Sequence, residues 1–196
     1  MCIRDRGVGV LETALALELG VTGPVLRAAG IPRDLRRDAP YLVYPELDFR
    51  VITLNESDAL ARFYVRLAEI RESAAILRQA LDKLPEGPYN AFETKKVLPK
   101  KERTYTKMEE LIHDFMLINM GINPPPGEVY HAVESSKGEL GFYIVSDGTG
   151  HPWRMKIRSP STCNLSALPI MLKGGMISDI VAVIGSLDPV MGEADK

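Results

Sequence analysis

A stripe of apolar residues, recurring at alternating spacings of three and four, runs from Leu60 to Leu84. This spacing places the residues on one face of an α-helix, because a helical turn takes about 3.6 residues. Side chains in Asn55–Asp58 can cap the start of the helix, and Pro85 ends it. The chain must therefore accommodate one long helix that packs lengthwise. The stripe comprises Leu60, Phe63, Leu67, Ile70, Ala74, Leu77, Leu81 and Leu84.

Two interpretations of this stripe are open: the core of an internal helical bundle, or a coiled coil that binds a partner. We favour the bundle core, because Arg62, Arg66 and Glu69 give the helix an ordinary exposed face. On that interpretation, Leu67→Ala or Leu77→Ala should each cost on the order of 2–5 kcal/mol of stability.

Four further segments favour helices. Leu11–Gly20 ends at a glycine, and Thr22–Pro24 starts a second helix with proline in its first turn. Thr106–Met120 has apolar residues around most of its circumference, so we expect a largely buried helix that packs on the long one. Met176–Ile184 is almost continuously apolar and predicts a buried helix.

Strands are predicted mainly near the C-terminus. Glu128–Glu134, Glu139–Val145 and Trp153–Ile157 are rich in aromatic and β-branched residues, and Ser146–Gly150 has the composition of a hairpin turn. An isolated short strand is expected at Phe49–Leu54. The predicted fold class is therefore α+β, mainly a helical bundle with a small antiparallel sheet near the C-terminus.

Composition indicates a soluble globular domain. The chain has 196 residues, of which 45% are hydrophobic and 26% charged, and a net charge of -2. This balance gives no basic footprint for nucleic acid. No segment approaches the roughly 18 consecutive apolar residues of a membrane span. The two cysteines, Cys2 and Cys163, cannot form a thiolate metal cage, and no secretory signal precedes them.

Charged residues form two candidate groups. Arg27, Asp34 and Arg36, with Arg37, could form a buried or interfacial charge network, since guanidinium binds carboxylate through paired hydrogen bonds. Solvated surface arginines are the alternative, for Arg37 more than for Arg27.

Glu134 and Glu139 are the second group. A carboxylate pair could perform acid–base chemistry. We prefer a structural role, in which the two residues cap turns or pair with Arg154 and Arg158 across the sheet.

The segments GELGFYIVSDG, PWRMKIRSPS and MISDIVAVIGSLDPVMGEADK, together with Gly20–Phe49, resemble the D subunit of respiratory NADH:quinone oxidoreductase, complex I. That family is similar to the large subunit of nickel-iron hydrogenases, which ends in Asp-Pro-Cys-x-x-Cys-x-x-His. Here Val190 and Glu193 stand at the two cysteine positions. A nickel-iron centre would lack its thiolate ligands, so the resemblance implies a hydrogenase-like fold without hydrogenase chemistry.

The resemblance implies a subunit in the peripheral arm of the complex, at the cytoplasmic face of the cell membrane. It would share a quinone cavity with a neighbouring iron-sulphur subunit, whose terminal cluster passes electrons to quinone. NADH would be oxidised at a flavin in another subunit, and proton translocation would occur in separate membrane subunits. No cofactor or metal would be bound by this chain, and no nucleic acid would be a partner.

Asp188, Val190, Met191 and Glu193 are the residues that the resemblance places at the quinone cavity. A valine would supply apolar lining, and a carboxylate could order the adjoining loop or relay protons. The alternative is structural: Asp188 would cap the turn into Pro189, and Glu193 would pair with an arginine.

Met1–Arg6 matches nothing in the family, so we interpret it as an artefact leader, and residues 7–196 as the C-terminal half of a domain of this family. The family is about twice as long, and its N-terminal half supports the quinone headgroup, so the isolated chain is expected to be inactive. A nickel-iron hydrogenase-related large subunit and a non-catalytic helical scaffold or interaction module are the alternative functions.

Overall fold

The computed structural model describes residues 5–88 and 97–195 and divides them between two compact units. Unit 1 lies within residues 1–83, 131–141 and 157–196, and unit 2 lies within residues 84–130 and 142–156. Residues 1–4 of the predicted leader Met1–Arg6 lie outside the described residues.

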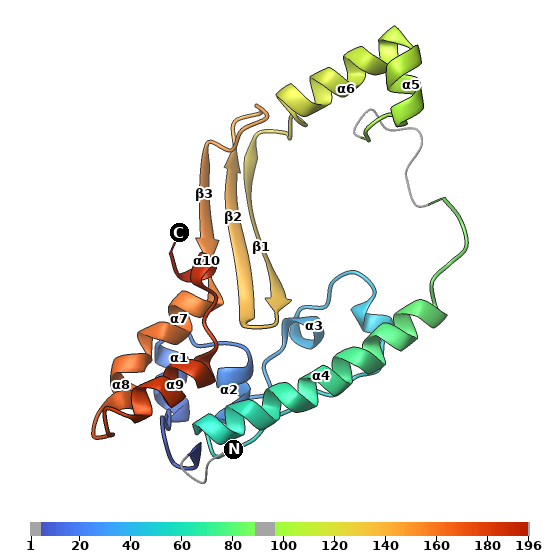
Figure 1. The fold of residues 1–196 in the computed structure, drawn as a ribbon. Coiled ribbons are helices and arrows are strands. Elements are labelled where there is room, and N and C mark those ends of the chain that lie inside the picture. The colour runs from blue at the N-terminus through green and yellow to red at the C-terminus, as the bar shows by residue number, and fades with distance from the viewer. Residues whose placement is uncertain (1–4, 89–96, 196) are drawn as a thin grey trace. The chain divides into compact units, whose positions relative to one another are not determined.

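Unit 1 is mainly helical (Figure 1). Its main apolar cluster joins helices from the two ends of the chain: Leu11, Val25 and Leu26 pack with Val183 and Leu187. The predicted helices in Leu11–Gly20 and after Thr22 are confirmed as the first two helices. The helices of unit 1 are α1 (Thr13–Glu18), α2 (Pro24–Ala28), α3 (Leu35–Asp38), η2 (Tyr44–Glu46), α4 (Ala59–Asp82), α7 (Pro160–Ser166), α8 (Leu168–Leu172), α9 (Asp179–Leu187) and α10 (Met191–Ala194).

Helix α4 is the predicted long helix, and its first turn is capped by Asp58, whose carboxylate accepts a hydrogen bond from the Ala61 amide at 2.7 Å. Its predicted core stripe is exposed from Phe63 onward, with Ile70 at 66% and Leu77 at 63%. The prediction of an internal bundle core along the stripe is therefore wrong for this chain. Helix α4 instead packs on α2 through Ala61 and Val65, because small side chains allow the two backbones to approach closely.

Arg62 also contradicts the sequence interpretation, because its side chain is fully buried. It donates hydrogen bonds to the carbonyls of Ser57 at 3.0 Å and Gly9 at 2.9 Å, and to the Ser186 hydroxyl at 3.0 Å. Burial lowers the pKa of Arg62 to about 10. A buried guanidinium with several fixed acceptors connects α4 to the start of the chain and to α9.

We expect Leu77→Ala to change the free energy of unfolding of the chain by less than about 0.5 kcal/mol, because the side chain is exposed. Val65→Ala, on the buried side of the same helix, should cost about 2 kcal/mol through lost burial and a residual cavity. Urea titration of both variants measures the difference. Equal losses would show that the stripe is also part of the core.

The sheet confirms the three strands predicted near the C-terminus. Strands β1 (Gly127–Ser135), β2 (Gly138–Ser146) and β3 (Arg154–Arg158) pair in the order β1-β2-β3, with neighbours antiparallel (Figure 1). The fold class α+β is confirmed.

The strand predicted at Phe49–Leu54 is wrong, since this segment is irregular. Its amides bond outside any ladder: Arg50 to the Glu72 carboxylate at 3.2 Å, and Leu54 to the Arg27 carbonyl at 3.1 Å. A β-rich composition does not make a strand where no neighbouring strand is available.

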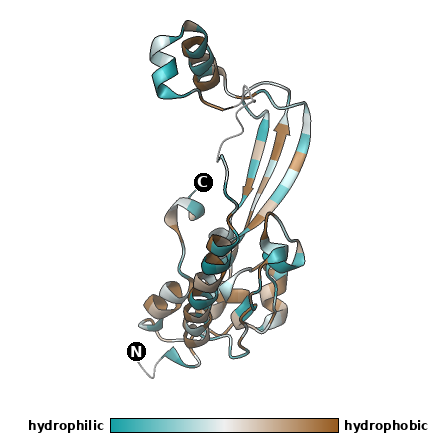
Figure 2. Ribbon diagram, turned by 90° about the vertical axis from the view of Figure 1, so that its right-hand side faces the viewer, coloured by the Kyte–Doolittle hydropathy of each residue, from teal (hydrophilic) through white to brown (hydrophobic). Residues whose placement is uncertain are grey.

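Unit 2 contains α5 (Lys101–Thr106) and α6 (Met108–Met120), which pack against each other. Helix α6 was predicted, and much of it is hydrophobic (Figure 2). None of its residues is buried, so the prediction of a largely buried helix is wrong in the structure. Its predicted packing on α4 stays a prediction.

Helix α9 overlaps the predicted segment Met176–Ile184 in sequence but is only partly buried. Val183 and Leu187 belong to the core, whereas Val181 is 78% exposed. The prediction of a buried helix is therefore wrong for its outer face. Continuous apolarity does not identify which side of a helix the rest of the chain covers.

Candidate functional site

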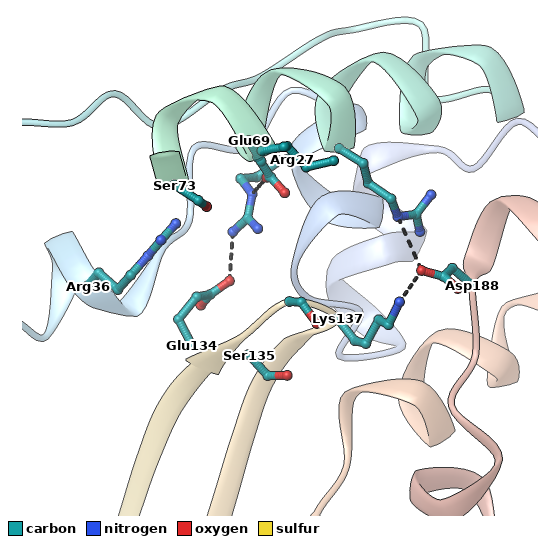
Figure 3. A pocket seen from close by; sticks show the side chains of 11 residues that line it. Arg27, Arg36, Glu69, Ser73, Glu134, Ser135, Lys137 and Asp188 are labelled. Carbon is teal, nitrogen blue, oxygen red and sulfur yellow. Dashed lines mark hydrogen bonds and ion pairs between the residues drawn. The ribbon is translucent and has the colours of Figure 1, made fainter. Parts of the chain in front are cut away.

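Arg27, at the end of α2, is the centre of a buried charge network in unit 1 (Figure 3). Its Nε donates to Glu69 Oε1 of α4 at 2.6 Å, and its Nη1 donates to Glu134 Oε1 of β1 at 2.8 Å. Burial disfavours the guanidinium charge, but the carboxylates of Glu69 and Glu134 hold the pKa of Arg27 above its ordinary value. Burial raises the pKa of Glu69 in turn.

Asp34 and Arg36 join this network. Arg36 donates from Nε to Asp34 Oδ1 at 2.9 Å and from Nη2 to Asp34 Oδ2 at 2.6 Å, and Arg27 Nη1 lies 3.9 Å from Asp34 Oδ2. Burial opposes the charge of Asp34, but the hydrogen bonds and positive charge of Arg36 hold the pKa of Asp34 below its usual value.

The structure thus brings together Arg27, Asp34 and Arg36, which the sequence suggested as a network. It adds Glu69, which sequence analysis assigned to an exposed helix face. Helical spacing alone gave no signal for Glu69, because its partner lies on another element.

The two glutamates of the sheet have different partners. Glu134 pairs with Arg27, whereas the sequence suggested that the sheet glutamates cap turns or pair with Arg154 and Arg158. Glu139 does approach Arg158, at 4.0 Å, but its closer partner is Arg33, at 3.0 Å. These ion pairs support the structural interpretation of both glutamates over an acid–base pair.

A cavity of about 330 Å³ opens beside this network (Figure 3). Cationic and anionic side chains face it together, so the cavity is suited to polar groups and ordered water more than to an apolar ligand. Its lining comprises Arg27, Arg36, Arg66, Glu69, Ile70, Ser73, Glu134, Ser135, Ser136, Lys137 and Asp188.

Asp188 is the one predicted quinone-cavity residue among those lining this cavity. It ends α9 in a left-handed conformation with φ 52°. Its carboxylate binds the ammonium of Lys137 (Figure 3). The same carboxylate lies 4.0 Å from Nε of Arg66.

Val190, Met191 and Glu193 lie in the C-terminal segment, residues 189–195, and do not line the cavity. Val190 is 41% exposed and Met191 is 74% exposed. The Glu193 carboxylate accepts a hydrogen bond from the Ser161 hydroxyl at 2.6 Å, and the Glu193 carbonyl accepts one from Ser159 at 2.6 Å. Glu193 therefore anchors α10 to α7 through serines, not through the arginine partner that sequence analysis considered.

Sequence reasoning did not select the hydroxyl groups of α7. Ser161 Oγ also accepts a hydrogen bond from the Val190 amide at 3.3 Å. The serine side chains contact the last residues of the chain across more than twenty positions of sequence, which no local pattern indicates.

Within the described parts of the chain, no three His, Cys, Asp or Glu side chains are grouped as a metal site would require. Cys163 is half-buried, and Cys2 lies outside the described residues. In the same parts of the chain, no helix is both long and apolar enough to cross a membrane.

The family model described as respiratory-chain NADH dehydrogenase, 49 Kd subunit, matches residues 1–196. The chain belongs to this family.

Two relatives are similar to the chain over nearly its whole length. The chain is 55% identical to the NADH-quinone oxidoreductase D 1 subunit of Chloroherpeton thalassium over 193 residues, covering 98% of this chain and 44% of the relative. It is 53% identical to the NADH-quinone oxidoreductase D subunit of Salinibacter ruber over 194 residues, covering 98% and 43%. The chain spans less than half the length of these two relatives.

Proposed function

We propose that this chain is part of the quinone-site subunit of an NADH:quinone oxidoreductase and forms part of the wall of the quinone cavity. The supporting observation is its membership of the 49 Kd family, with relatives named as D subunits over 98% of the chain. Electrons from NADH would enter at a flavin in another subunit and reach quinone through iron-sulphur clusters of partner subunits. The chain itself would hold no redox centre.

The C-terminal segment is the part of this chain that would meet the quinone. Val190 and Met191 are exposed apolar side chains, suited to contact with an isoprenoid-substituted ring. Glu193 would act indirectly, because its carboxylate is already bonded to Ser161. Asp188 would connect the segment to the charged cavity through Lys137.

The partners and location follow from the same proposal. The neighbour across the quinone cavity would be the iron-sulphur subunit with the terminal cluster. The assembly would lie in the peripheral arm, at the cytoplasmic face of the membrane, and quinone reduction would drive proton translocation in separate membrane subunits.

A non-catalytic scaffold is a second candidate function, favoured by the exposed apolar stripe of α4. Nickel-iron hydrogenase chemistry is disfavoured, because valine and a serine-bonded glutamate occupy the positions that would need thiolates. A change at Val190 should affect quinone reduction if the chain is part of the quinone site, and should leave it unchanged if the chain is a scaffold.

In the assembled complex, we expect Val190→Met to lower NADH:quinone turnover or to alter sensitivity to quinone-site inhibitors, because a longer side chain alters the cavity wall. NADH oxidation with ferricyanide, which takes electrons near the flavin, should be unchanged. Val181→Met on the exposed face of α9 is the matched control. Wild-type quinone kinetics and inhibitor response in a fully assembled Val190→Met complex would favour the scaffold.

A further inference from the structure

The turn that leads into the C-terminal segment has an unfavourable backbone conformation. Asp188 has φ 52° and ψ 56° and directly precedes Pro189. Left-handed backbone is costly for most residues other than glycine, and although aspartate tolerates it better than most, the proline that follows favours an extended conformation in the residue before it. Such a conformation persists only where surrounding contacts impose it. The contacts of Asp188 therefore determine the direction in which the chain continues to Val190.

Lys137 provides the closest of these contacts, and its own position is fixed. Its ammonium binds the Asp188 carboxylate, and its side chain is 19% exposed. Its backbone carbonyl accepts a hydrogen bond from Asn164 Nδ2 of α7 at 3.3 Å. Gly23 approaches the same carbonyl so closely that a Cβ there would lie 2.4 Å from it. The β1–β2 turn thus presents Lys137 from an anchored backbone.

Arg66 of α4 provides a second contact on the same turn. Its Nη2 donates to the Leu187 carbonyl at 3.2 Å, and its Nε lies 4.0 Å from Asp188 Oδ2. That Nε is buried and has no hydrogen-bond partner of its own. Two cations from separate elements therefore face one carboxylate at the end of α9.

We propose that Lys137 and Arg66 are positioning residues, which hold the Asp188–Pro189 turn and thereby set the place of Val190 and Met191 in the quinone cavity. The inference rests on the proposed function. Neither cation touches quinone: each acts through the carboxylate of Asp188. Loss of the Lys137 pair removes a contact that stabilises the left-handed turn, so Val190 and Met191 shift, while the Ser161 hydroxyl still bonds the Val190 amide and the Glu193 carboxylate.

The test uses the assembled complex with the full-length protein, a soluble short-chain quinone and ferricyanide as acceptors. Lys137→Met should raise KM for the quinone by about tenfold, with a smaller change in kcat, since Val190 and Met191 contact bound quinone and a displacement of about 1 Å can cost up to about a hundredfold. Lys137→Arg keeps the cation and should restore KM. The ferricyanide reaction should be unchanged, as should all rates in Lys173→Met, a matched loss of an exposed lysine.

The double variant Lys137→Met with Asp188→Asn should be no worse than the more affected single variant, because both changes break the same pair. Additive effects would overturn the inference, since Asp188 would then act independently of Lys137. Asp188→Asn preserves the size of the side chain, so its KM for quinone tests the inference if Lys137→Met fails to assemble. Loss of assembly in both, with Lys137→Arg active, would assign the pair to folding and also overturn the positioning role.

Val190→Met separates this inference from the function on which it rests. Altered quinone kinetics in Val190→Met, with wild-type KM in assembled Lys137→Met and Asp188→Asn, would overturn the positioning role alone. Wild-type quinone kinetics in all three assembled complexes would overturn the proposed function as well.

Discussion

Arg27→Met is expected to lower the free energy of unfolding of the chain by about 3–5 kcal/mol, because it leaves buried carboxylates without their cation. Glu69 and Glu134 both lose their hydrogen bonds to the guanidinium, while methionine fills much of the vacated space. Urea titration followed by circular dichroism measures the loss.

Arg50→Met is the matched control. Arg50 pairs with Glu72 at 2.8 Å, but its side chain is 82% exposed, so solvent screens the interaction. The expected loss is below about 1 kcal/mol. Similar losses in both variants would mean that the Arg27 network is as solvated as a surface ion pair.

Gly23→Ala is the second change with a large expected effect, because no space exists for a Cβ. The added carbon would lie 2.4 Å from the Lys137 carbonyl oxygen and 2.6 Å from Gly138 Cα, both backbone atoms. The backbone at Gly23 also has φ 73°. We therefore expect Gly23→Ala to lower the free energy of unfolding by about 3 kcal/mol or more.

Gly20→Ala separates the backbone effect from the steric one. Gly20 has a similar φ of 66°, but a Cβ there would meet nothing within 4 Å. We expect a loss of about 1–2 kcal/mol from the left-handed conformation alone. Thermal unfolding of both variants gives the comparison, and equal losses would contradict the close packing of Gly23 on the β1–β2 turn.

Local patterns predicted the elements that depend on local chemistry. The cap at Asp58, the proline at Pro24 and the turn-rich Ser146–Gly150 each mark an element boundary close to the observed one. These residues act through their own backbone or that of near neighbours, so a single sequence is enough to recognise them.

Burial was predicted less well, because it depends on what the rest of the protein covers. The spacing from Leu60 to Leu84 correctly indicated a helix, but the structure buries the other side, where Ala61, Arg62 and Val65 lie. Arg62 was expected in solvent because it is charged. Its acceptors lie on distant segments, and nothing near it in sequence indicates them.

In the candidate site, too, the sequence indicated one residue and only the fold revealed its contacts. Asp188 was selected through its family resemblance, and the structure adds Lys137 and Arg66 as its contacts. Lys137 lies fifty-one positions away in the sequence, so only the fold could show that the two side chains meet.

Photoaffinity labelling of the assembled complex tests the quinone-cavity assignment most directly. A quinone with a photoreactive group on its ring is irradiated, and the labelled peptides of the full-length protein are identified by mass spectrometry. We predict label on the segment Val190–Met191, removed by excess unmodified quinone, and reduced in Lys137→Met. Competable label elsewhere in the complex, with none on Val190–Met191, would contradict the assignment.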